Sequence, residues 1–93
     1  MDHIERLLHE IQNDRRIRVL PSRRFAEEVG RIYEKYGYGL TKAFLQAKLH
    51  EEKGRSQDEI RSLLLVIDKV KSYNLPSSIG GYIIRKLPFI VRR

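Results

Sequence analysis

The sequence predicts an all-α fold, a small bundle of four to five short helices with an apolar, basic C-terminal extension. Apolar residues recur at helical spacing along most of the chain. Capping residues, glycines and prolines separate these periodic segments. The 93 residues include no cysteine, which excludes disulfides and thiolate metal sites. We expect residues 1–76 to form the bundle domain and residues 77–93 the extension, packed on the bundle or on a partner.

The first helix is expected from about Asp2 to Asn13. Asp2 can cap its first turn, and Glu5 follows three residues later as in a capping box. One apolar stripe runs along it, formed by Ile4, Leu7, Leu8 and Ile11.

A connector follows, in which residues 15–24 carry five arginines and no acid. Basic and β-branched residues alternate over residues 16–19, which indicates a short extended piece. An extended segment over residues 17–20 can pair with residues 89–91 as a minor two-stranded element. Pro21 ends it, and Ser22 offers the N-cap of the next helix.

The second helix is expected over residues 23–36, with Gly37 as its left-handed terminator. Thr41 is expected to cap a third helix that ends near Lys53. The third helix is apolar on two sides, so we expect it to be sandwiched in the core or to touch another chain. Its two sides are Leu40, Ala43, Phe44 and Ala47, and Leu45 with Leu49.

The fourth helix is expected from Ser56 to about Tyr73. Residues 56–59 read as a capping box before an apolar run. The apolar stripe of this helix is wide, so we expect it to be the central helix. Asn74 and Pro76 stop it.

The tail begins with Ser77 or Ser78 as the cap of a short fifth helix through Leu87, although two glycines lower its helix propensity. Pro88 ends any helix there, and residues 89–91 read as an extended apolar stub. The tail is too apolar to remain disordered.

The net charge of +7 is distributed unevenly. Residues 15–24 contribute +5 and residues 69–93 contribute +6, with no acid in either segment, while the remainder carries −4. Such polarised charge favours a polyanionic partner. Arginine suits phosphate because its planar fork donates two hydrogen bonds at once.

We therefore expect a small basic, non-enzymatic nucleic-acid-binding protein that makes mainly phosphate contacts. DNA is favoured over RNA, and the small size favours an accessory subunit of a nucleoprotein or DNA replication/processing complex. The expected contacts are Arg15, Arg16, Arg18, Arg23, Arg24, Arg31, Lys35, Lys42, Arg85, Lys86, Arg92 and Arg93.

Aromatic residues interleave with lysines between Tyr33 and Lys42, as in surfaces that stack the bases of single strands. Helical spacing favours core positions for Tyr33 and Tyr36. Tyr38 lies between two glycines and is free to be exposed.

Three alternatives stay open. A protein–protein adaptor would meet an acidic partner through the arginine-rich connector and dock its C-terminal tail. A homo-oligomer would form through Leu45, Leu49 and Leu65. A long helix-turn-helix variant would read a groove, although Lys42, Gln46 and Lys48 are few readers for a recognition helix. The expected protein contacts are Leu45, Leu49, Leu65, Phe89, Ile90 and Val91.

Enzyme signatures are absent from the sequence, which has neither a glycine-rich phosphate loop nor a G-x-S-x-G motif. Its acidic pairs are adjacent in expected helices, so their side chains diverge by about 100°. The three histidines lack the spacing of a metal site. We expect no catalysis, no cofactor and no metal.

No apolar run reaches the roughly 18 residues that span a bilayer. The first 14 residues lack the apolar block of a signal peptide. We expect no membrane partner and a cytoplasmic location, nucleoid-associated if the partner is DNA. The scarcity of asparagine and glutamine beside many charges is typical of thermophile proteins.

Overall fold

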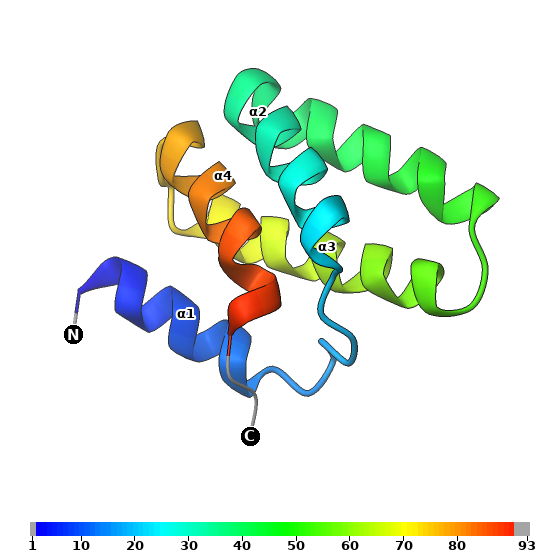
Figure 1. Cartoon of the computed structure of the whole chain (residues 1–93). Coiled ribbons are helices and arrows are strands. Elements are labelled where there is room, and N and C mark those ends of the chain that lie inside the picture. The colour runs from blue at the N-terminus through cyan, green and yellow to red at the C-terminus, as the bar shows by residue number, and fades with distance from the viewer. Residues whose placement is uncertain (1, 91–93) are drawn as a thin grey trace.

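The computed structural model describes residues 2–90 as a bundle of helices (Figure 1). Its elements are α1 (His3–Asn13), α2 (Arg23–Glu51), α3 (Arg55–Ser72), α4 (Ser77–Lys86) and the 3-10 turn η1 (Leu87–Phe89). The all-α bundle predicted from the sequence is confirmed. Residues 2–90 contain no strand, so the predicted pairing of residues 17–20 with the tail is wrong, because Phe89 belongs to η1.

The helix α1 begins as predicted, because the Asp2 side chain accepts a hydrogen bond from the Glu5 backbone N–H at 2.8 Å. Leu7 and Ile11 of its apolar stripe are fully buried, whereas Ile4 is partly exposed. The helix packs against α3. The first residue of the stripe, Ile4, therefore lies at the edge of the core.

The long helix α2 combines the two helices predicted over residues 23–36 and 41–53 (Figure 1). Gly37 interrupts it with φ 84° and ψ −170°, a backbone conformation that glycine adopts without strain and other L-residues do not. The chain bends there without an intervening loop. Thr41 is not a helix cap, because its buried hydroxyl donates instead to the Gly37 carbonyl at 2.7 Å.

The helix α3 contacts α1, α2 and α4, which agrees with the central position expected for it. The capping box predicted at residues 56–59 does not form. The helix begins one residue earlier, after Gly54 with φ 65°, and has no side-chain cap. Glu59 instead accepts the Ser22 backbone N–H at 2.6 Å, so it joins α3 to the end of the connector.

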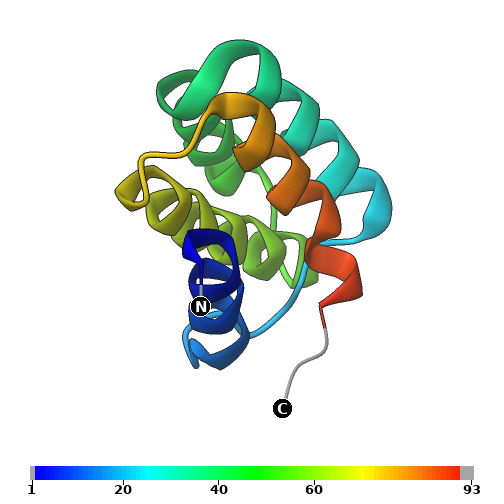
Figure 2. The same ribbon diagram turned by 90° about the vertical axis from the view of Figure 1, so that its left-hand side faces the viewer.

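The helix α4 lies antiparallel to the first half of α2, and these two helices share the most extensive contact in the bundle (Figure 2). Three buried glycines, Gly30, Gly80 and Gly81, allow this approach. A Cβ on Gly81 would lie 2.7 Å from the Gly30 carbonyl oxygen, and one on Gly80 would overlap the Tyr33 ring. These glycines are therefore required by packing, although they weaken the helix by propensity alone.

The core is contributed by all four helices, the connector and η1. Ile17 of the connector and Leu87 of η1 are completely buried. No helix within residues 2–90 is long and apolar enough to cross a membrane.

Candidate nucleic-acid interface

The connector between α1 and α2 is fixed to the bundle rather than extended into solvent. Ile17 and Pro21 are buried, while Arg15, Arg16 and Arg18 are exposed. The alternation seen in the sequence therefore has a structural meaning: apolar side chains anchor the connector and its arginines face outward.

Asp14 holds the start of the connector in place, and its side chain is only 8% exposed. Its Oδ1 accepts the Arg16 backbone N–H at 2.9 Å and the Arg16 Nε–H at 3.0 Å, and its Oδ2 accepts Arg16 Nη2 at 2.7 Å. Lys69 Nζ of α3 lies 3.1 Å from the same Oδ2. Arg16 is thus neutralised within the chain, although the run of residues 15–24 contains no acid.

These hydrogen bonds and charges, those of Arg16 foremost, hold the pKa of Asp14 well below its usual range. The stability that Asp14 contributes is therefore complete above the ordinary aspartate pKa of about 4 and is lost as the pH falls further. We expect Asp14→Asn to lose about 1–2 kcal/mol at pH 7 because charge-assisted hydrogen bonds become neutral ones. Urea unfolding at pH 7 and at pH 2.5 measures this.

The control for Asp14→Asn is Glu51→Gln, which removes an exposed carboxylate that has no cation within 4 Å among the described residues. Glu51→Gln should change the stability little at either pH. A loss in Asp14→Asn that persists undiminished at pH 2.5 would contradict the assignment to the Asp14 charge.

One end of the molecule gathers cations from separate parts of the chain. The connector, the first turn of α2 and η1 meet there (Figure 1). Arg18 and Arg55 line a surface depression together with Pro88. Arg23 at the start of α2 lies over the Phe89 ring, with Cζ 5.4 Å from the ring centroid. Cations that are far apart in the sequence therefore share one surface.

Two exposed aromatic rings lie on this same surface, Tyr82 at 53% and Phe89 at 58% exposure. Lys86 Nζ lies 5.3 Å from the Tyr82 ring centroid and 6.0 Å from that of Phe89. Arg23 is a second cation over Phe89, so each of the two rings adjoins at least one cation. We call Tyr82, Lys86, Phe89 and Arg23 the ring–cation row. The sequence prediction placed Phe89 at a protein contact and did not single out Tyr82, whose i, i+4 spacing to Lys86 was the available signal.

Several other predicted phosphate contacts are engaged within the chain or lie elsewhere. Each of the following pairs joins a predicted contact to an acid or a ring: Arg31 with Glu27 at 3.6 Å, Lys42 with Asp68 at 3.6 Å, Arg85 with Glu34, and Lys35 with the Tyr36 ring at 5.3 Å. Lys42 lies beyond the kink of α2, whose first half extends about 20 Å at 1.5 Å per residue. The kink end of α2 is therefore remote from the connector.

Arg24 is exposed and lines a second surface depression that also contains Glu27, Glu28 and Arg31. This depression carries both signs of charge. Arg92 and Arg93 lie outside the described residues.

Of the three tyrosines near the kink, Tyr36 differs from its expectation. Tyr33 is buried as predicted, but Tyr36 is 54% exposed. Tyr38 is half-buried, and its hydroxyl donates to Asp68 at 2.5 Å and accepts from Lys42 at 3.0 Å. Tyr36 lies in the last turn before Gly37, so only Tyr38 stands beyond the bend that changes the helical phase.

The predicted protein contacts are distributed between core and surface. Leu45 is completely buried, so the expectation that it faces another chain is wrong. Leu49, Leu65 and Ile90 are half-buried and pack against the core, whereas Phe89 is exposed. Val91 lies outside the described residues.

The second half of α2 exposes an apolar strip that the sequence had assigned to one side of a sandwiched helix. Leu40 is 58% exposed, and Ala43 and Ala47 are exposed beside it. The groove-reading alternative is weakened here, because Lys42 pairs with Asp68 and Lys48 lies over the Phe25 and Phe44 rings.

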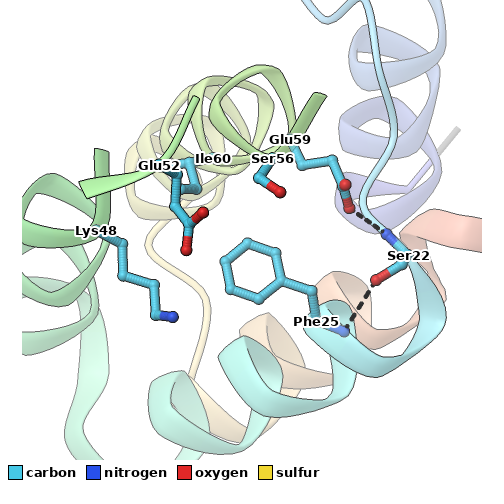
Figure 3. A pocket seen from close by; sticks show the side chains of 7 residues that line it. All are labelled: Ser22, Phe25, Lys48, Glu52, Ser56, Glu59 and Ile60. Atoms are coloured by element: carbon cyan, nitrogen blue, oxygen red, sulfur yellow. Dashed lines mark hydrogen bonds between the residues drawn. The ribbon is translucent and has the colours of Figure 1, made fainter. Parts of the chain in front are cut away.

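A cavity of about 190 Å³ lies between the two ends of α2 and the start of α3 (Figure 3). Phe25, Lys48 and Glu52 point into it. Two of its charged groups already serve the fold, since Glu59 accepts the Ser22 N–H and Lys48 lies 6.0 Å from the Phe25 ring centroid. Within residues 2–90 no three histidine, aspartate or glutamate side chains gather as metal ligands.

A comparison of the chain with protein-family models, with the curated proteins and with the solved structures found no match.

Proposed function

We propose that this chain is a small, non-enzymatic nucleic-acid-binding protein that contacts phosphates with the end of the bundle where the connector, α2 and η1 meet. One observation carries the proposal. Arg18, Arg23 and Lys86 are all exposed, and no carboxylate among the described residues lies within 4 Å of their cationic nitrogens. Unpaired cations from three segments on one surface suit a polyanion.

The charge at the start of α2 supports the same proposal. The first turn of this helix carries Arg23 and Arg24 and no acid. The N-terminal end of a helix bears partial positive charge, so cations there destabilise the helix, by about 0.3–1 kcal/mol each at exposed sites. A bound phosphate would relieve that repulsion. The stability of the helix therefore does not account for these two arginines.

The proposal includes DNA rather than RNA as the partner and a cytoplasmic, nucleoid-associated location. A domain of this size with one basic end fits an accessory subunit of a nucleoprotein or DNA replication/processing complex better than a protein that acts alone. Arg15 and Arg24 extend the contact surface. Arg16, Arg31, Lys42 and Arg85 are secondary, because each already has an acidic partner.

The test is fluorescence anisotropy of labelled DNA and RNA, single- and double-stranded, titrated with the protein at several salt concentrations. The double variant Arg18→Ala with Arg23→Ala removes two phosphate contacts. Its slope of log K against log[salt] should become shallower by about 1.8 for duplex and about 1.4 for single strands. Affinity should fall for every DNA sequence alike.

The matched control is Arg6→Ala with Arg61→Ala, which removes the same two charges from exposed positions of α1 and α3. This control should keep the salt slope of the unchanged protein. Equal slopes for the two double variants would show that net charge alone, rather than this surface, governs binding, and would overturn the proposal.

A protein–protein adaptor is the second candidate, and the apolar strip on α2 favours it. Tyr36 and Leu40 are both more than half exposed near the kink, beside the exposed Ala43 and Ala47. Exposed apolar groups that are contiguous suit a partner surface. An adaptor would bind one protein through apolar burial, which salt weakens little, whereas phosphate binding weakens steeply with salt.

A further inference from the structure

We propose that the ring–cation row Tyr82, Lys86, Phe89 and Arg23 is a platform for single-stranded nucleic acid, in which Tyr82 and Phe89 each stack a base and the two cations hold the backbone. This inference rests on the proposed function and names the form of nucleic acid that the same surface takes. Single strands are bound by aromatic faces set in a basic groove, because every base has a face to stack.

The exposure of the two rings is the first support. A phenylalanine and a tyrosine that are each more than half exposed keep apolar area in water although the core lies directly beneath them. Neighbouring residues on α4 and η1, Ile83, Ile84 and Leu87, are buried. The two rings therefore lie on the outer side of an element whose inner side is already packed.

The position of the cations is the second support. Lys86 Nζ adjoins both rings, 5.3 Å from the Tyr82 centroid and 6.0 Å from the Phe89 centroid, and Arg23 Cζ lies 5.4 Å from the Phe89 centroid. A nucleic-acid strand carries one phosphate for each base, and this row carries two cations beside two rings. Glu27 lies one turn after Arg23 and pairs with Arg31, so Arg23 keeps its charge available.

The spacing of the rings favours an unstacked strand. Tyr82 and Phe89 are seven residues apart on a continuous helical path, which separates them by about 10 Å at 1.5 Å per residue. Successive bases in a duplex are about 3.4 Å apart and are covered by their neighbours. Two rings at the wider spacing can each take a base only where the bases are not stacked on one another.

The cations do not prevent stacking. Their side chains are exposed and flexible, and an exposed cation–π contact is weak. A stacked base contributes more than such a contact. Arg23 and Lys86 can therefore leave the ring faces for phosphates while bases take their places.

The experiment compares a labelled 12-mer oligothymidylate with a labelled duplex of the same length, by anisotropy at fixed salt. Phe89→Leu and Tyr82→Leu remove a ring face and keep an apolar side chain and the net charge. Each should weaken oligothymidylate binding about 5- to 150-fold and duplex binding less than 2-fold. Tyr82→Phe, which retains the ring, should bind the oligothymidylate as the unchanged protein does.

Tyr36→Leu is the matched control, because Tyr36 is 54% exposed and has Lys35 at 5.3 Å but lies near the kink, away from the row. It should leave both affinities unchanged. All the substituted rings are exposed, so thermal unfolding followed by circular dichroism should show a folded protein for each variant.

The outcomes separate this inference from the proposed function. If Phe89→Leu and Tyr82→Leu weaken single strands no more than Tyr36→Leu, or weaken duplex equally, stacking is overturned while phosphate binding stands. If polyglutamate of equal charge competes with oligothymidylate as well as unlabelled oligothymidylate does, the rings contribute nothing and the platform is overturned. If the unchanged protein binds no nucleic acid, the proposed function fails and the inference with it.

Discussion

Replacing Gly81 by alanine should lower the stability of the bundle by about 2–3 kcal/mol, although alanine is the better helix former by about 1 kcal/mol. The added methyl would lie 2.7 Å from the Gly30 carbonyl oxygen and 3.1 Å from Glu34 Cβ. The nearest obstacle is backbone, so α2 and α4 would have to separate. The thermal midpoint should fall by roughly 10–20 °C for a domain of this size.

Gly39→Ala is the control for this experiment. Gly39 is exposed in α2, and a Cβ there meets nothing within 4 Å. Only the higher helix propensity of alanine then affects the stability, so the substitution should stabilise the protein by up to about 1 kcal/mol. The two substitutions are chemically identical and should have opposite signs. A Gly81→Ala variant as stable as the unchanged protein would mean that the two helices do not approach as closely as described.

The kink in α2 should be equally sensitive at Gly37. Alanine there should cost about 2 kcal/mol, because φ 84° with ψ −170° is accessible to glycine and strained for an L-residue. Space does not limit the substitution, since the nearest atom to a new Cβ is Ser77 Oγ at 3.7 Å. The loss would therefore report backbone strain alone. Chemical denaturation of Gly37→Ala beside Gly39→Ala measures it.

A D-alanine at position 37, introduced by chemical synthesis, separates strain from other causes. The mirror image of the Gly37 conformation is ordinary extended backbone, so a D-residue adopts it without strain. Stability should then return to that of the glycine protein or exceed it. Equal losses for the L- and D-alanine proteins would contradict the strain explanation.

Local signals in the sequence predicted the helix ends well where a single side chain or backbone conformation decides them. Ser22 accepts the Phe25 N–H at 3.2 Å, as expected of an N-cap. Asn74 has φ 56° and follows the end of α3, as expected of a helix stop. Gly37 adopts positive φ as a terminator would, but α2 resumes directly after it and continues to Glu51.

Signals that depend on tertiary neighbours could not be read in this way. Glu59 had the spacing of a capping box, yet its carboxylate accepts the backbone N–H of Ser22, which is 37 residues away in the sequence. Asp14 precedes an arginine run, and only the fold brings Lys69 to it. The candidate interface shares this limit, since Arg23 and Phe89 are 66 residues apart and become neighbours only through the pairing of α2 with α4.

The pairing of α2 with α4 has a consequence for the order of folding. It joins segments about fifty residues apart, so an appreciable loop must close before the glycine contact can form. During synthesis the residues of α1, α2 and α3 are joined to the chain before those of α4. The face of α2 that holds Gly30 and Tyr33 then lacks the cover that Gly81 and Gly80 give it. Full cooperativity should therefore arrive late, once residues 80 and 81 reach Tyr33 and Gly30, and this face of α2 stays uncovered until then.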